Sequence, residues 1–284
     1  MLVAVAASWG LSIGISKDLV EHVPVADYLA VRYAIGFVVL LMLRPRSVGT
    51  VDRQDLGTGV VLGLVYAVAQ YIQFEGLTRA DIVVASFLVS LYVVFTPLLL
   101  ALVRRRPPTR VVTVGTLLSL GGVALMSVRG WSFGTGELLT VVAALIYAIH
   151  VIGVGRWSRP GRAVTLTAVQ LGAMAVAFSV VALPDGLTTP SGRGWAALTY
   201  VGVVGGAAIL AQMWAQARMS AESAAILLVL EPVWASLFAV VWWGESPGPR
   251  TIAGASLVIA ASVIVVIASG RRRQIVPGTA TVHP

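Results

Sequence analysis

The sequence has no cysteine, few histidines and few charged residues, and each shortage excludes a class of protein. Without cysteine there are no disulfides and no cysteine-ligated metal sites, and three histidines offer no metal cluster. Charged residues make up 11% of the chain and hydrophobic residues 58%. Because soluble domains carry about 25% charged residues, this composition excludes a soluble protein.

Motifs of several functional classes are absent too. The ATP-binding pattern GxxxxGK[ST] is missing, which argues against ATP-driven transport within this chain. HExxH and a paired nucleophile and base do not occur, which argues against an intramembrane enzyme, and no cofactor is expected. A TVGYG filter and an S4-like arginine repeat are also missing, which disfavours those types of channel.

What the chain does contain is a series of apolar stretches, each suited to a helix that crosses the ~30 Å hydrocarbon core of a bilayer. They are continuous and do not alternate with period two, so they predict helices and not a membrane β-barrel. The first begins at Met1 without a polar flank, so either its end lies among the headgroups or the natural start lies upstream. The ten predicted spans are 1–16, 25–43, 57–78, 82–103, 111–128, 138–155, 163–183, 195–217, 222–243 and 251–269.

Basic residues between the spans predict the orientation in the membrane. With the N-terminus in the cytoplasm, 14 basic residues fall inside and 5 outside, with Arg32 left within a span. The positive-inside rule therefore favours two cytoplasmic termini in the cell membrane. The same clusters explain the net charge of +8 by topology and contact with anionic lipid, so no nucleic-acid partner is expected.

The chain also repeats itself at a distance of 138–140 residues. At this shift Trp9 falls on Tyr147, and Pro107, Arg110 and Gly130 fall on identical residues. Each unit holds five spans, and an odd number inverts the second unit relative to the first, as in many secondary transporters, with the substrate site between the units. We therefore predict an all-α membrane protein of two inverted five-helix repeats, residues 1–130 and 131–270, followed by a disordered cytoplasmic tail over 271–284.

Five motifs in a fixed order resemble a known family. They are ASWG at 7–10, VRY at 31–33, SLYVVFTP at 90–97, LEPV at 230–233 and GE at 244–245. Together they resemble the EamA-type members of the drug/metabolite transporter superfamily over about residues 1–269. The resemblance implies a basket of ten transmembrane helices around a central cavity, with the fifth and tenth helices at the periphery, and export or exchange of small metabolites.

Glu231 is the acidic residue nearest mid-membrane, and it directly precedes Pro232. Proline lacks a backbone N–H and blocks the hydrogen bond of the preceding turn, which frees a carbonyl beside the carboxylate. Such a spot suits a proton, a cation or an ammonium group, and predicts substrate binding or coupling to protons or a counter-substrate. The alternative is a hydrogen-bonded carboxyl group that only fixes a kink. Because the first half has Tyr92 in place of Pro232, and its own proline at Pro97, we expect the two halves to bend differently.

Arg32 is the basic residue within a span, roughly 10 Å from the outer end of its helix by helix rise. Glu75 and Lys17 lie nearer the same face. The group predicts an outer vestibule that attracts or releases a charged substrate. The alternative is a structural ion pair between Arg32 and Glu75 that joins two helices.

Uncharged polar and aromatic residues inside the spans are further candidates for a cavity lining. His150, Gln170 and Gln212 come from three different spans, which predicts a shared polar surface near Glu231, and Gln73 matches Gln212 in the repeat. Ordinary packing is the alternative for the aromatic candidates, which could otherwise bind apolar or cationic groups; these are Trp9, Tyr92, Trp214 and Trp234.

These observations predict a secondary transporter that exports or exchanges small metabolites or drug-like compounds by alternating access. The alternative is a flippase for a lipid-linked substrate, which predicts a laterally open groove in place of a closed cavity. The expected partners are a small-molecule substrate and membrane lipid. The sequence leaves open the identity of the substrate, the direction of transport, the coupling ion and the oligomeric state.

Overall fold

In the computed structural model, the described part of the chain folds into helices alone, over residues 1–45, 51–80, 85, 88–127, 134–243 and 248–274. The helices are α1 (Leu2–Val20), α2 (Val25–Leu43), α4 (Arg53–Leu77), α6 (Tyr92–Arg104), α7 (Arg110–Ser127), α8 (Thr135–Trp157), α9 (Ala163–Ala182), α10 (Arg193–Gln216), α11 (Ala221–Leu228), α12 (Glu231–Trp243) and α13 (Pro249–Gln274), with a short 3₁₀ helix, η1 (Leu183–Asp185), after α9.

Helices long and apolar enough to cross a membrane make up most of this structure. Seven such segments are Leu2–Val20, Val25–Leu43, Arg53–Leu77, Thr135–Trp157, Ala163–Ala182, Arg193–Gln216 and Ala221–Phe238. Three shorter apolar helices are Tyr92–Arg104, Arg110–Leu125 and Pro249–Val265. Each of the ten predicted spans overlaps one of these segments. Large apolar side chains such as Met42, Leu102 and Val180 are exposed on the outside, as a lipid-facing surface requires.

Polar side chains cap the first turn of several helices. The Asp52 carboxylate accepts a hydrogen bond of 2.7 Å from the Asp55 backbone N–H at the start of α4, and this bond lowers the pKa of Asp52 below its ordinary value. The Ser220 hydroxyl caps α11 in the same way, by accepting from the Ser223 N–H. At the start of α8, Glu137 accepts from the Gly134 N–H at 2.8 Å. These capping side chains fix the residue at which each helix begins.

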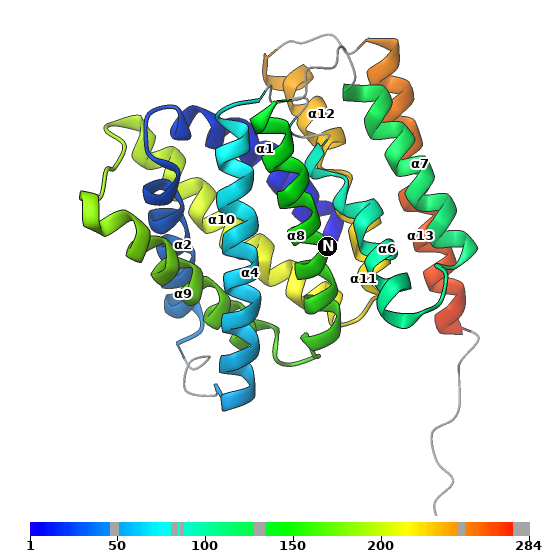
Figure 1. Ribbon diagram of the computed structural model, residues 1–284, viewed down its shortest axis with the longest axis horizontal. Coiled ribbons are helices and arrows are strands. Elements are labelled where there is room, and N and C mark those ends of the chain that lie inside the picture. Colours follow the sequence, from blue (N-terminus) through cyan, green and yellow to red (C-terminus); the bar gives the residue numbers. More distant parts are fainter. Residues whose placement is uncertain (46–50, 81–84, 86–87, 128–133, 244–247, 275–284) are drawn as a thin grey trace, which may run out of the picture.

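The two halves of the chain pack against each other around the centre of the molecule (Figure 1). α1 packs against α10 and α12, α2 against α9 and α10, and α4 against α8 and α9. α7 and α13 pack along each other at one side (Figure 1). The core of the protein is therefore an interface between its halves.

Arginines gather at one end of the molecule, which we call the Arg-rich face. It is the lower end in Figure 1, where α6 and α8 end and where α4 and α11 begin. Ion pairs join these helix ends: Arg104 pairs with Glu222, and Arg162 pairs with Asp52 and Asp55. We call the other end, where α1 and α4 terminate and α2 begins, the opposite face.

Two predicted spans are interrupted at positions 139 residues apart. Ser90 and Leu91 form a turn between the helical residues 88–89 and α6, and Val229 and Leu230 form a turn between α11 and α12. The prediction of unbroken helices over 82–103 and 222–243 is therefore wrong at these points. Both spans break at equivalent positions, although we expected the two halves to bend differently.

Proline explains the second break but not the first. Pro232 is the second residue of α12, where a helix needs no N–H donor, and it cannot bond back to the preceding turn. In the first half Pro97 lies within α6, beyond the break. Yet each break tightens the backbone in the same way: Leu91 donates to the Leu88 carbonyl at 3.2 Å, and Leu230 donates to the Leu227 carbonyl at 3.4 Å.

The ends of the first and last spans also differ from prediction. α1 continues beyond residue 16 to Val20, so Lys17 is helical. α13 continues through residues 271–273 to Gln274, so the first part of the predicted disordered tail is a helix. Gly130, the motif at 244–245, the start of the 82–103 span and residues 275–284 lie outside the described residues.

α1 crosses α12 closely because residue 10 has no side chain. A Cβ atom at Gly10 would lie 2.7 Å from the carbonyl oxygen of Glu231 and 2.9 Å from the backbone nitrogen of Ala235. Both atoms belong to the backbone and cannot rotate away. Gly10 therefore fixes the separation between α1 and the helix that begins at Glu231.

We predict that Gly10→Ala destabilises the protein, because overpacking a core contact costs about 1–3 kcal/mol. The melting temperature in detergent should fall by several degrees. Gly57→Ala is the matched control, since a Cβ at Gly57 meets no atom within 4 Å. Equal melting temperatures for the two variants would contradict the close approach of α1 and α12.

Candidate functional site

A cavity lies between the two halves and reaches both helix breaks. It contains about 640 Å³ of space free of protein atoms, its opening to solvent included. α1, α2, α4, α8, α10 and both interrupted spans contribute to its wall. Seven of the ten predicted site residues line it, which are Trp9, Arg32, Gln73, Tyr92, His150, Gln212 and Glu231.

Arg32 is held in the wall of this cavity by aromatic residues. Its Nη1 donates a hydrogen bond of 3.0 Å to the Tyr28 hydroxyl, which lies 2.6 Å from the Ser16 hydroxyl oxygen. The guanidinium carbon lies 5.6 Å from the ring centre of Tyr33 and 5.9 Å from that of Phe74, within the range of cation–π attraction. These contacts hold a charge in a fixed place, where a substrate anion could reach it.

The proposed structural pair of Arg32 with Glu75 is not present. Glu75 pairs instead with Arg79, one turn away on the same helix, at 2.7 Å. The alternative role that the sequence allowed for Arg32 is therefore wrong, because a partner at the i+4 position satisfies Glu75 near the surface.

Glu231 begins α12 directly after the second helix break. A carboxylate in the first turn of a helix is favoured by the positive end of the helix dipole. Among the described residues, the Glu231 carboxylate has no hydrogen-bond or ion-pair partner. The helix break therefore places an acidic group at the cavity wall, where its carboxylate is available to a ligand.

Hydrogen bonds join tyrosines and glutamines on one side of the cavity. The Tyr33 hydroxyl donates to Gln70 at 2.7 Å, the Gln70 amide donates to the Tyr147 hydroxyl, and this hydroxyl donates to Gln73 at 2.5 Å. The ring of Tyr66 packs against Tyr147 and, at 4.6 Å between ring centres, against His150. The network ties α2, α4 and α8 together, and therefore joins the two halves.

A second set of amides lies toward the Arg-rich face. Gln170 Nε2 lies 3.2 Å from His150 Nε2, Gln212 donates to Gln216 at 2.9 Å, and Gln216 donates to the Val151 carbonyl at 2.9 Å. His150 and Gln212 line the cavity, whereas Gln170 is buried behind His150. Gln170 therefore supports the wall and does not form it.

Several buried polar atoms in the wall have no hydrogen-bond partner in the described structure. Such atoms are rare in folded proteins and call for an explanation, which a bound ligand or water supplies. Those in cavity-lining residues are Arg32 Nε, Tyr92 Oη, His150 Nδ1 and Gln212 Oε1. Together with the Glu231 carboxylate, they offer donors and acceptors to a small polar ligand.

Two predicted site residues lie elsewhere. The Trp214 side chain is 46% exposed and stacks on Arg218, whose guanidinium carbon is 3.9 Å from its ring centre. Trp214 is therefore a surface residue near the Arg-rich face, and its prediction as a cavity wall is wrong. Trp234 packs on Phe238 within α12 at 5.9 Å between ring centres and does not line the cavity.

Other residues also line the cavity although the sequence did not predict them. Tyr66 and Gln70 lie four residues apart on α4, and with Gln73 they form one polar face of that helix. This spacing of polar residues in a span is the signal that could have identified them. Ser12 and Ser16 on α1 carried no such signal, because a serine can bond to its own helix, as Ser12 does with the Ser8 carbonyl at 2.7 Å.

Most of the wall is built from residues that the repeat relates to each other. Twelve of the lining residues form six pairs separated by 138 or 139 residues, with one member in each half. The pairs are Trp9 and Tyr147, Ser12 and His150, Ile13 and Val151, Gln73 and Gln212, Val89 and Leu228, and Tyr92 and Glu231. Equivalent positions of the two halves therefore meet around one cavity.

Comparison with known proteins identifies relatives over nearly the whole chain. The model of the EamA-like transporter family matches residues 1–128 and again residues 134–267. The pseudopaline exporter CntI of Pseudomonas aeruginosa is 27% identical over 277 residues, which cover 93% of this chain and 94% of the exporter. A "Probable terminal-alkyne amino-acid exporter" of Streptantibioticus cattleyicolor is 27% identical over 198 residues, 67% of this chain and 66% of that protein.

The fold has a relative among solved structures as well. One crystal structure superposes with a TM-score of 0.78 at 19% identity, and the match covers 95% of this chain and 97% of that one. At this identity the likeness concerns the fold alone. The helical arrangement described above is therefore one that another protein also adopts.

Two tyrosines of the cavity should respond differently to loss of the hydroxyl group. Tyr147→Phe removes bonds to Gln70 and Gln73, so we expect a loss of about 1–3 kcal/mol of stability and a lower melting temperature. Tyr92→Phe is the matched control, because its buried hydroxyl has no partner in the described structure, and its melting temperature should not fall. A fall of the same size in both variants would contradict the network.

Proposed function

Since the chain belongs to the EamA-like transporter family, we propose that this multi-pass membrane protein is a secondary transporter that exports or exchanges small metabolites through the central cavity. The observation that carries the proposal is the presence of two ionisable groups of opposite sign, Arg32 and Glu231, in the wall of one cavity. A solute with a carboxylate and an amino group fits such a wall, because each charged group meets one of opposite sign.

The remaining lining suits a solute that also has polar and apolar parts. The unpartnered atoms of Tyr92, His150 and Gln212 offer hydrogen bonds, while Trp9 and Phe74 offer apolar surface. Two relatives of the chain are named as exporters, and one name specifies an amino acid. These names support a small amphoteric metabolite as the substrate of this chain.

We further propose that the two halves are inverted repeats of five spans each, residues 1–130 and 131–270, which alternate access to the cavity. The six lining pairs and the two equivalent helix breaks support this proposal. Discontinuous helices at the interface of inverted repeats are a recurrent feature of secondary transporters. Each break can act as a hinge, since its backbone has fewer helical hydrogen bonds to distort.

Glu231 is the proposed coupling group, because it is the acidic residue in the cavity wall. A carboxyl group that can gain and lose a proton at the substrate site links substrate release to proton entry. The substrate ammonium group and the proton then compete for the same oxygen atoms. Because one displaces the other, a pH gradient can drive transport of the substrate without ATP.

The proposed function is tested with the purified chain in proteoliposomes. A panel of amino acids, other amphoteric metabolites and one lipid-linked sugar is offered with and without a pH gradient. We expect saturable movement of an amphoteric solute that the gradient accelerates. Movement of the lipid-linked sugar alone would refute the proposal in favour of a flippase.

Glu231→Gln should abolish most transport driven by the pH gradient. The substitution keeps the size and hydrogen-bonding capacity of the side chain but removes the titratable proton. The protein should insert and melt normally, because the carboxylate has no partner in the described structure. Normal gradient-driven transport by this variant would show that Glu231 is not the coupling group.

The proposed orientation places both termini and the Arg-rich face in the cytoplasm. The absence of cysteine permits a clean test with single substitutions at exposed loop positions. In intact cells an impermeant thiol reagent should label Ser191→Cys and should not label Pro107→Cys. The reverse pattern would overturn the orientation.

A further inference from the structure

Five lining residues of the cavity fall outside the six repeat-related pairs. They are Ser16, Arg32, Tyr66, Gln70 and Phe74, and all belong to the first half of the chain. Most lie toward the opposite face, since Ser16 is near the end of α1, Arg32 is in the first part of α2, and Phe74 is near the end of α4. The cavity is therefore symmetric at its centre and extends toward one face only.

The repeat identifies the residues that stand in the same places in the second half. A shift of 138 or 139 residues leads to Val154, Gln170, Gly205, Ile209 and Met213. All five are buried and none lines the cavity. Val154 is near the end of α8 and Met213 near the end of α10, so these equivalents lie toward the Arg-rich face. The cavity is therefore open between the five residues on the side of the opposite face. The five equivalent residues on the side of the Arg-rich face are closed off by the packing of the helices.

A separate apolar cluster closes this second region. Val154 and Met213 pack with Leu62, Ala163 and Leu166, apart from the main core of the protein. The cluster brings together α4, α8, α9 and α10, which come from both halves. An apolar contact between halves can part and re-form as a unit, because no hydrogen bond of its side chains has to break.

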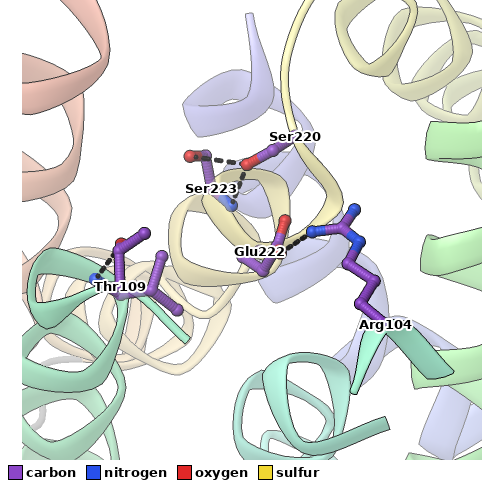
Figure 2. Close-up of polar contacts among 6 residues, drawn as sticks. Arg104, Thr109, Ser220, Glu222 and Ser223 are labelled. Atoms are coloured by element: carbon purple, nitrogen blue, oxygen red, sulfur yellow. Dashed lines mark hydrogen bonds and ion pairs between the residues drawn. The ribbon is translucent and has the colours of Figure 1, made fainter. Parts of the chain in front are cut away.

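An ion pair ties the same face together. Arg104 at the end of α6 reaches Glu222 in the first turn of α11, with 2.8 Å between Nη1 and Oε1 (Figure 2). The Glu222 side chain is 11% exposed and that of Arg104 58%. Ser220 and Ser223 fix the start of α11 around Glu222 (Figure 2). The pair joins the two segments that lie on the Arg-rich side of the two helix breaks.

The sequence provides no such pair at the equivalent positions of the repeat. There, Glu222 corresponds to Val83 and Arg104 to Gly244, neither of which can ionise. These two equivalent positions therefore cannot form the ion pair that joins α6 and α11 at the Arg-rich face.

We propose that Val154, Gln170, Gly205, Ile209 and Met213 line a second access path to the cavity, which opens toward the Arg-rich face when the Arg104–Glu222 ion pair separates. The inference rests on the proposed alternating access. In the open state Gln170 lines the second path in the way that Arg32 lines the present cavity. The helices around Ser16 and Phe74 then pack together and close the present opening. The two half-helices α6 and α11 swing about the breaks at 90–91 and 229–230.

Cysteine labelling in lipid nanodiscs tests the proposal, because the reagent then has access to both faces. Met213→Cys reports the second path and Gln73→Cys reports the present cavity. Glu222→Gln removes the buried partner of the ion pair, and Arg104→Gln removes the exposed partner. Each should raise the labelling rate of Met213→Cys at least severalfold and lower that of Gln73→Cys. The exchange Arg104→Glu with Glu222→Arg should restore the original rates.

Two controls separate gating from general loosening and from a change in charge. Leu198→Cys lies on the same helix as Met213, is equally buried, and packs in the main core toward the opposite face. Its labelling rate should not change. Arg106→Gln removes a positive charge from the same loop but leaves Arg104 and Glu222 in place, so it should leave every rate unchanged.

The proposal is overturned if breaking the pair leaves the labelling of Met213→Cys unchanged, if Leu198→Cys gains as much, or if Arg106→Gln has the same effect. Labelling needs no substrate, so its outcome is independent of the transport assay. A chain that shows the reciprocal labelling but moves no solute refutes the proposed function alone. A chain that transports but does not respond at Met213 refutes this inference alone.

Discussion

The hydrocarbon core of a bilayer offers no partner to a polar group, and the rest of this structure depends on that constraint. Arg32, Gln70, Gln73, Tyr147 and His150 lie within helices whose outer surfaces are apolar. They are kept there because the two halves of the chain close around them, with Tyr33, Gln70 and Tyr147 bonded across α2, α4 and α8. A polar cavity is therefore possible only at the interface between the halves. The proposed path of a solute lies at the same interface.

The sequence predicted the parts of this structure that are set by composition and local chemistry. The limits of α2 agree with the predicted span over 25–43, because Pro24 precedes an apolar run of the length that a membrane requires. Polar residues such as Gln212 and Glu231 were identified as site residues for a simple reason: each is costly in a span unless it faces the interior. Ser12 and Ser16 could not be identified in this way, because their hydroxyl groups cost little in a span.

Features that depend on the packing between helices could not be predicted in this way. Trp214 has the same hydropathy whether it faces a cavity or Arg218, and only the rotation of α10 decides. The break at Ser90 has no proline to mark it, and it follows from the tertiary structure. The pair of Arg104 with Glu222 joins residues 118 positions apart that occupy non-equivalent places in the repeat, so neither local pattern nor internal symmetry predicts it.

The charges of the cavity break the symmetry that its shape retains. Arg32 corresponds to Gln170 and Glu231 to Tyr92, so each charge occurs once and neither is duplicated by the repeat. If access alternates between the faces, the shape of the path is exchanged between the halves, but the two charges stay with their own helices. A solute with two charged groups can therefore remain bound in one orientation while the path around it changes. The repeat therefore provides two similar paths to the cavity. Arg32 and Glu231, which have no charged equivalents in the repeat, give the site a different charge at each end.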